Sequence, residues 1–201
     1  MEIVQVGAAV LRHPGRPVDL AELRTKEFRQ LVEQMRETMI DAPGVGLAAP
    51  QIGLSIQLAV LEDPPEFVEA QSPEQRALTE RDSLPFTVMI NPVVTPIGEE
   101  TVEFFEGCLS VDGYRALVSR YRTVHARWID LDGAECEQDF TGWPARIVQH
   151  EVDHLRGIVY VDRMLPRSFM TTDAWAEHWG GTAIEEIHAA LRVDAVTPPH
   201  P

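Results

Sequence analysis

The chain has 201 residues, 44% hydrophobic and 24% charged, which suits an ordinary globular protein with a buried core. No apolar run approaches the roughly 20 residues of a membrane-spanning helix, and the N-terminus lacks the pattern of a secretory signal. The formal net charge of −15 disfavours non-specific binding to nucleic acid or to an anionic membrane. Two cysteines, Cys108 and Cys136, are too few for a disulfide framework and fit a reducing cytoplasm.

The first part of the chain predicts a helix, a segment of small residues and a strand. Within residues 25–42, apolar side chains recur at the spacing of one helical face: Phe28, Leu31, Val32, Met35 and Met39. Residues 44–53 are mostly small, so a ligand or another backbone can approach them closely, and Gln51 is the side chain there that can donate hydrogen bonds. The apolar run at 56–61 predicts a strand.

The middle of the chain predicts several strands after an irregular segment. Residues 62–85 are rich in Pro, Glu, Gln and Ser and show no period, so we expect a surface insertion there. Strand-like runs follow at 86–90, 93–97, 101–105, 121–129 and 134–140. Helices are expected at 143–156 and, as one or two elements, at 173–192, and the end at about 194–201 is expected to be flexible.

The order of these elements predicts the fold class. The strands come in a consecutive run with helices before and after it, which favours an α+β fold with antiparallel or mixed sheets over alternating βαβ units. We expect residues 1–201 to form a single domain, with the insertion at about 62–85 on its surface.

An H-E-x-x-H pattern, His150-Glu151-x-x-His154, lies inside the predicted helix at 143–156. Positions four apart share one helical face, so the two imidazoles can point at one metal ion. Glu151 lies beside His150, where a carboxylate can take a proton from a metal-bound water. The pattern also occurs by chance on solvated helices, so a metal site needs a third ligand. If the site does bind a metal, we expect the helix at 143–156 to be a central metal-binding helix around which the sheets pack.

The third ligand decides the class of site, because a catalytic zinc-type centre needs three protein ligands and an open position. A third histidine is excluded, since Tyr160 stands where an extended H-E-x-x-H-x-x-G-x-x-H motif would have it. Cys108 is favoured because it follows strand-like sequence, and two imidazoles with a thiolate suit Fe²⁺ or Zn²⁺. A carboxylate ligand is the alternative, with Glu177 as the candidate.

Other interpretations stay open on this evidence. A nucleophilic Cys–His pair would leave the second histidine and Glu151 without a role. A zinc peptidase or amidase with a carboxylate ligand would cleave internal peptide bonds. A non-catalytic binding module would close its metal site with a fourth protein ligand.

Three segments carry a family resemblance: GVGLAAPQ at 44–51, EGCLS at 106–110 and QHEVDH at 149–154. They resemble the three signature motifs of peptide deformylases, in the same order. The resemblance extends from the first predicted helix to about residue 160. The long insertion and the Val111-Asp112 pair after the cysteine motif are similar to the longer, Gram-positive-like branch of that family.

The resemblance implies a metal-dependent hydrolase that removes the N-formyl group from the N-terminal methionine of newly made polypeptides and releases formate. Members of the family typically use Fe²⁺, and also work with Ni²⁺, Co²⁺ or Zn²⁺. The implied partners are formyl-methionyl nascent peptides and, transiently, the ribosome. No direct nucleic-acid or membrane partner is expected, and the implied location is the cytoplasm.

Carried over by position, the resemblance also implies roles for single residues. The implied metal ligands are Cys108, His150 and His154. Glu151 is the implied general acid and base. The side-chain amide of Gln51 and the backbone N–H of Leu109 would stabilise the oxyanion, and Gly46 would meet the substrate backbone.

The remaining assignments concern the surroundings of the site. Glu106 would support the metal ligands without binding the metal itself. Arg115 aligns with an arginine that lies near the substrate tail in the family. Val45, Ile147 and Leu109 are expected to line an apolar pocket for the methionine side chain. Arg146 stands where some relatives have an apolar residue, and we expect it to border that pocket.

Overall fold

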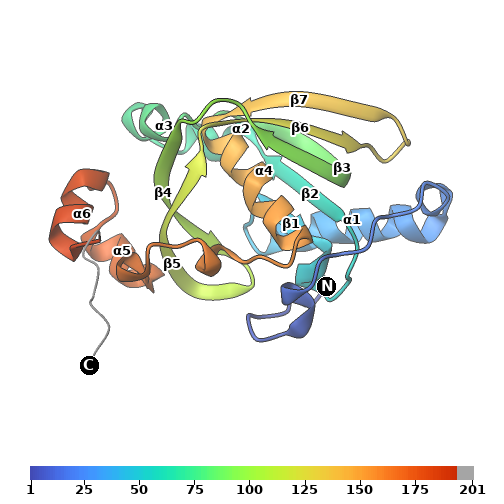
Figure 1. Cartoon of the computed structure of the whole chain (residues 1–201), viewed down its shortest axis with the longest axis horizontal. Coiled ribbons are helices and arrows are strands. Elements are labelled where there is room, and N and C mark those ends of the chain that lie inside the picture. The colour runs from blue at the N-terminus through green and yellow to red at the C-terminus, as the bar shows by residue number, and fades with distance from the viewer. Residues whose placement is uncertain (194–201) are drawn as a thin grey trace.

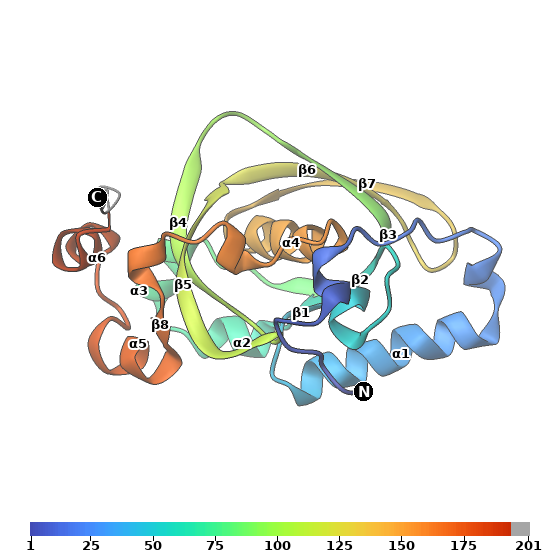
Figure 2. The same ribbon diagram turned by 60° about the horizontal axis from the view of Figure 1, so that its bottom comes forward.

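Two antiparallel sheets and one helix between them organise residues 1–193, the part of the chain that this computed structural model describes. The larger sheet has the order β1-β2-β3-β6-β7, with bounds Gly46–Ala48, Leu58–Asp63, Leu84–Pro96, Thr123–Ile129 and Glu135–Thr141. The smaller sheet has the order β4-β5-β8, with bounds Thr101–Cys108, Val111–Tyr121 and Met170–Thr171. Helix α4 (Gly142–Leu155) contacts strands of both sheets, as Figure 1 and Figure 2 show.

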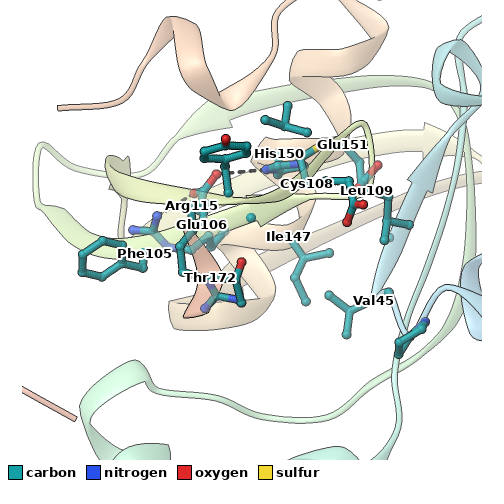
Figure 3. A pocket seen from close by; sticks show the side chains of 18 of the residues that line it. Val45, Phe105, Glu106, Cys108, Leu109, Arg115, Ile147, His150, Glu151 and Thr172 are labelled. Carbon is teal, nitrogen blue, oxygen red and sulfur yellow. Dashed lines mark hydrogen bonds and ion pairs between the residues drawn. The ribbon is translucent and has the colours of Figure 1, made fainter. Parts of the chain in front are cut away.

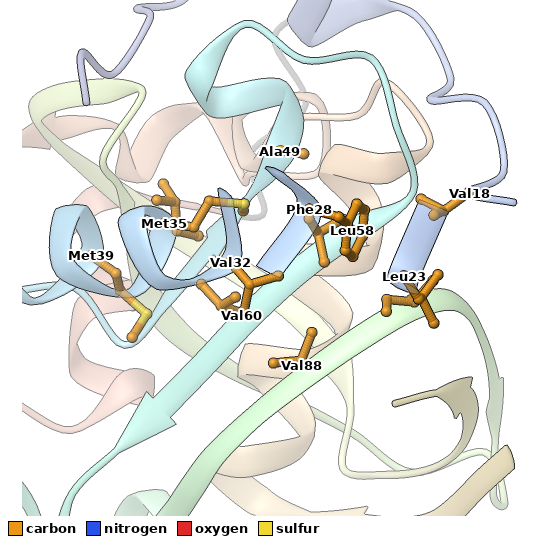
Figure 4. Packing of buried hydrophobic residues seen from close by; sticks show 12 residues of the cluster. Val18, Leu23, Phe28, Val32, Met35, Met39, Ala49, Leu58, Val60 and Val88 are labelled. Carbon is orange, nitrogen blue, oxygen red and sulfur yellow. The ribbon is translucent and has the colours of Figure 1, made fainter. Parts of the chain in front are cut away.

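Helix α1 (Lys26–Asp41) covers one face of the larger sheet. Thr25 caps its first turn by accepting a hydrogen bond from the backbone N–H of Phe28. The apolar stripe of the helix then packs on β2 and β3, forming the cluster drawn in Figure 4, which includes Val32, Met35, Met39, Leu58, Val60 and Val88. Burying one such side chain contributes about 1.5–3 kcal/mol, so this cluster holds the sheet edge on which β1 lies.

The other helices are shorter. Helices α2 (Pro65–Glu69) and α3 (Pro73–Thr79) lie between β2 and β3 in the chain, and α5 (Thr172–His178) and α6 (Ile184–Leu191) follow β8. Single 3₁₀ turns occupy Ala9–Arg12, Glu22–Arg24, Ala49–Ile52, Tyr160–Asp162 and Pro166–Ser168. Figure 1 and Figure 2 both place α3, α5 and α6 on the β4–β5 side of the molecule. Among the helices of residues 1–193, none combines the length and apolar character needed to cross a bilayer.

The prediction of an α+β fold with antiparallel sheets is confirmed. Two of the expected strands are one strand in the structure, and β5 (Val111–Tyr121) falls almost wholly between the runs expected at 101–105 and 121–129. The runs predicted at 86–90 and 93–97 form one strand, β3, with a register shift between Ile90 and Val93. Asn91 adopts a positive φ of 51° at this irregularity, and its side-chain amide bonds both the N–H and the C=O of Val18. A tertiary contact therefore stabilises a bulge where the Asn-Pro pair predicted a break.

The segment at 62–85 is more ordered than its composition indicated. Ser72 caps α3 by a reciprocal pair of hydrogen bonds with Gln75, which gives this short helix a defined start. Arg81 donates two hydrogen bonds of 2.8 Å to the buried carboxylate of Asp63. The region expected to be flexible at about 194–201 lies outside the described residues.

Candidate metal and active site

Helix α4 carries the H-E-x-x-H pattern on a face that packs inside the fold. Its apolar side chains at Ala145, Val148 and Val152 are buried between the sheets, so the residues around them are buried too. Glu151 and His154 are 4% and 1% exposed. The ring centroids of His150 and His154 are 5.0 Å apart, the distance expected for side chains one helical turn apart.

Cys108 ends strand β4 against this helical face. The β4–β5 register shifts between Gly107 and Cys108, an irregularity of the kind that re-aims a side chain. Cys108 Sγ lies 3.2 Å from His154 Nε2, and the ligand atoms of Cys108, His150 and His154 all lie within 4.8 Å of one another. These three donors fit a divalent transition metal, since imidazole and thiolate together suit iron and zinc.

Hydrogen bonds reach the sulfur of Cys108, and burial keeps the ring of His154 neutral. The sulfur accepts hydrogen bonds from Gln51 Nε2 at 3.5 Å and from the Ser110 N–H at 3.4 Å. Burial lowers the pKa of His154 well below its usual value, so its ring is neutral and keeps a lone pair. The alternative ligand Glu177 lies on α5, where its carboxylate is exposed and 3.7 Å from His178, outside this group.

A buried ion-pair network holds the ring of His150 through its Nδ1 atom. Glu106 Oε2 lies 2.9 Å from His150 Nδ1, which leaves the Nε2 atom of that ring for a metal. Arg120 bonds both oxygens of Glu106, and Arg146 Nη1 lies 2.6 Å from Glu106 Oε1. Burial alone would raise the pKa of Glu106, but the charge and hydrogen bonds of Arg120, with His150, hold that pKa well below its usual value. Glu106 is therefore an anion at neutral pH.

Glu151 lies beside the three donors with its carboxyl group shielded from solvent. Burial raises its pKa to about 7, with a smaller contribution from the charge of Glu106. Its Oε2 atom is buried and has no hydrogen-bond partner among the described residues. A Cβ atom added at Gly46 would fall 2.2 Å from Glu151 Oε1, so a residue without a side chain is required there. A carboxyl group in this state can both accept and donate a proton near neutral pH.

Gln51 is fixed so that its amide nitrogen faces the sulfur. Its Oε1 accepts a 2.8 Å hydrogen bond from the Ala48 N–H, which directs Nε2 toward Cys108. The N-terminal segment joins this turn to the end of β4: the Val4 N–H bonds the Gln51 carbonyl at 2.8 Å, and the Val6 N–H bonds the Ser110 carbonyl at 2.7 Å. The first and second motifs are thus held together by residues that precede both.

A pocket of about 440 Å³ opens in front of these groups. Of the residues expected in the site, all except His154 line it: Val45, Gly46, Gln51, Glu106, Cys108, Leu109, Arg115, Arg146, Ile147, His150 and Glu151. In the view of Figure 3, Val45 and Leu109 lie at one end of the pocket and Phe105 and Arg115 at the other, with Ile147 between them. The pocket thus has a mainly apolar end and an end with an arginine.

Arg120 is the residue that sequence reasoning missed. It is 4% exposed and links Glu106 to Asp153, which also bonds Arg163. The signal was present in the alternation of β5, because Arg120 shares the inward face with the buried Ala116 and Val118. A charged residue on a buried face needs a buried partner.

Arg146 lines the pocket, and its guanidinium also bonds groups inside the fold. Besides Glu106, it bonds the backbone carbonyls of Val118 at 2.9 Å and Val102 at 2.7 Å, and the residue is 2% exposed. The positive charge of Arg146 is therefore paired within the buried network that includes Glu106.

The comparisons with known proteins agree with one another. The polypeptide deformylase family model matches residues 1–169. The peptide deformylase of Bifidobacterium adolescentis is 46% identical over 179 residues, 89% of this chain and 79% of that protein. Peptide deformylase 1A, chloroplastic, from Solanum lycopersicum is 42% identical over 172 residues, which cover 86% of this chain and 62% of that longer protein.

Solved structures show the same likeness. A class I type b peptide deformylase from Acinetobacter baumannii, with Met-Ala-Ser bound, superposes with a TM-score of 0.72 at 34% sequence identity. The match covers 82% of this chain and 98% of the other.

Proposed function

This chain belongs to the peptide deformylase family of hydrolases, and we propose that it removes the N-formyl group from the N-terminal methionine of newly made polypeptides and releases formate. The observation that carries the proposal is the grouping of a thiol and two imidazoles within 4.8 Å, with the buried carboxyl group of Glu151 beside them in one pocket. Three donors leave a further coordination position for substrate, as hydrolytic metal sites require.

In this proposal, helix α4 is the metal-binding helix around which the sheets pack, and Cys108, His150 and His154 hold one divalent ion. Fe²⁺ is the proposed ion in the cell, with Zn²⁺, Ni²⁺ and Co²⁺ as substitutes, in keeping with the mixed sulfur and nitrogen donors. A bound ion would supply Lewis-acid chemistry, lowering the pKa of water and polarising the formyl carbonyl.

The chain's own residues would handle the proton and the developing charge. Glu151 takes a proton from the attacking water and later gives it to the departing amine, a task for which a carboxyl pKa of about 7 is well matched. The Gln51 amide and the Leu109 N–H donate hydrogen bonds to the formyl oxygen as negative charge grows there. Supporting the first assignment, Gln51 Nε2 lies 3.5 Å from Cys108 Sγ, at the side of the proposed ligand group.

The peptide would bind along the edge of the larger sheet. Strand β1 is an edge strand, and an extended peptide can pair with such an edge through main-chain hydrogen bonds. Gly46 lets that peptide approach Glu151, while Val45, Leu109 and Ile147 receive the methionine side chain and Arg115 lies toward the peptide tail. The Acinetobacter relative has Met-Ala-Ser bound, which supports a peptide that begins with methionine as the ligand of this family's site.

The wider setting is part of the same proposal. Residues 1–201 act as one catalytic domain in the cytoplasm, and both cysteines are free thiols, as a reducing compartment requires. The substrates are nascent chains, met during transient contact with the ribosome, with no nucleic acid or membrane bound directly.

The test is formate release from formyl-Met-Ala-Ser by anaerobically purified protein, with metal content measured on the same sample. We expect about one metal ion per chain and formate from the formyl peptide, but no acetate from acetyl-Met-Ala-Ser. Glu151→Gln should keep the metal and lose turnover, because glutamine cannot shuttle a proton. Cleavage of internal peptide bonds instead of formate release would contradict the proposal and favour a peptidase.

A further inference from the structure

A second cavity, which we call the aromatic pocket, adjoins the proposed active site. It has a volume of about 280 Å³ and is lined by residues of α3, β4 and the α5–α6 segment, with Arg115 of β5 and Trp143 of α4. Its principal lining residues are Leu78, Phe104, Trp143, Trp175, Trp179 and Ile184. Pockets for whole drug-sized ligands measure roughly 300–1,000 Å³, so this one suits a single large side chain better than a complete small molecule.

The aromatic pocket shares part of its wall with the catalytic pocket. Arg81, Phe105, Arg115 and Trp143 line both cavities. Arg115 marks the border, because its guanidinium carbon lies 4.1 Å from the ring centroid of Trp175, a residue that lines the aromatic pocket alone. Thr172, at the start of α5, lines the catalytic pocket, so the same helix contributes to both cavities.

Part of the wall of the aromatic pocket lies outside the part of the chain matched by the family model. That match ends at residue 169, whereas Trp175, Trp179 and Ile184 follow it. Leu78 comes from α3, within the 62–85 segment. Figure 1 and Figure 2 show α3, α5 and α6 on the same side of the molecule, beside β4 and β5. Two segments distant in sequence thus build one cavity at the end of the proposed active site.

We propose that the aromatic pocket is a subsite for an apolar or aromatic side chain of the formyl peptide, carried downstream of its methionine. This rests on the proposed function, which puts the methionine near Val45, Leu109 and Ile147. In Figure 3, Arg115 and Phe105 lie at the opposite end of the catalytic pocket from Val45. A peptide that leaves the methionine end in their direction reaches the border of the aromatic pocket. Aromatic side chains then meet Trp and Phe rings, whose edge-to-face and offset contacts are favourable.

The chain offers a matched pair of variants to test this subsite. Leu78, on α3, is 57% exposed and lines the aromatic pocket, while Ile40, on α1, is 56% exposed and lines none of the cavities described here. Because both side chains are more than half exposed, neither is expected to be needed for folding. Leu78→Asp adds a charge at the rim of the pocket, and Ile40→Asp adds the same charge elsewhere.

The experiment compares formyl-Met-Ala-Ser-Ser with three peptides in which phenylalanine replaces the second, third or fourth residue. We expect phenylalanine at one of these positions to raise kcat/KM about tenfold over the parent, the scale of apolar discrimination in enzyme pockets. Leu78→Asp should reduce that ratio several-fold, whereas Ile40→Asp should leave it unchanged. Three of the four tryptophans, Trp143, Trp175 and Trp179, line the pocket, so the deformylated phenylalanine peptide should also change tryptophan fluorescence more than the deformylated parent does.

The outcomes separate this proposal from the proposed function. Formate released equally from all four peptides, or a phenylalanine preference that Leu78→Asp and Ile40→Asp affect alike, would overturn the subsite and leave deformylation intact. If no peptide releases formate, the proposed function is overturned and the subsite with it.

Discussion

Arg120 donates hydrogen bonds of 2.8 and 2.9 Å to the two carboxylate oxygens of Glu106, and both side chains are almost fully buried. Glu106 in turn faces the Nδ1 atom of His150. A carboxylate behind a histidine selects which ring nitrogen carries the proton and fixes the orientation of the ring. Arg120 therefore acts on the proposed ligand group without belonging to it.

We predict that Arg120→Met destabilises the protein far more than Arg163→Met, although both arginines bond Asp153. Removing one partner from a buried ion pair costs about 3–5 kcal/mol, because the other charge is left buried and unpaired. The side chain of Arg163 is 42% exposed, and such pairs contribute about 1 kcal/mol or less. Urea unfolding followed by circular dichroism measures both changes in the free energy of unfolding. Equal losses in the two variants would contradict the importance assigned to burial.

Much of the fold follows from local sequence patterns. The helix at Lys26–Asp41 was predictable because its apolar stripe and its capping threonine agree. The continuity of β3 was not, because Asn91 is held in its bulge by the backbone of Val18, 73 residues away in the chain. Similarly, α3 depends on a cap at Ser72 within a segment whose composition indicates an irregular loop.

The pairing of His150 with His154 was predictable from motif spacing, and the family resemblance implied the other members of the site, but the supporting network was not predictable. H-E-x-x-H spacing places two imidazoles together on any helix. The three-way contact of Arg120, Arg146 and Glu106 joins β4, β5 and α4, and no local pattern specifies it. Arg146 illustrates what the sequence alone cannot predict. Its position near the pocket was indicated, but the direction of its guanidinium depends on backbone carbonyl groups of two other strands.

Gly46→Ala should reduce turnover about 100-fold, the loss typical of a catalytic group displaced by about 1 Å. The new methyl group would lie 2.2 Å from Glu151 Oε1, so the carboxyl group must move. Gly107→Ala is the steric control, because the nearest atom to its new methyl group is the Tyr114 carbonyl oxygen at 3.6 Å. Steady-state formate release measures both. A larger loss for Gly107→Ala would mean that the contact with Glu151 is not what requires glycine at position 46.

Cys108→Ala should abolish metal binding, while Cys136→Ala should not affect it. Cys108 Sγ lies 3.2 Å from His154 Nε2, whereas Cys136 lies on β7 with Asp130 as its side-chain neighbour, 3.9 Å away. Elemental analysis of both variants, purified anaerobically, measures metal per chain. Full metal content in Cys108→Ala would exclude the thiol as a ligand and favour a carboxylate as the third ligand.

Gln51→Glu should lower kcat by about 100- to 1,000-fold, the usual consequence of losing one oxyanion donor. Glutamate preserves the shape of the side chain and the oxygen that accepts the Ala48 N–H, but it replaces the amide N–H group with a second oxygen. Gln57→Glu provides the control: that change removes a comparable amide donor, here bonded to the Gly15 carbonyl at 3.1 Å, at a residue that does not line the catalytic pocket. Because the donor is needed chiefly as charge develops, KM for formyl-Met-Ala-Ser should change much less than kcat. An unchanged kcat in Gln51→Glu would remove Gln51 from the proposed reaction.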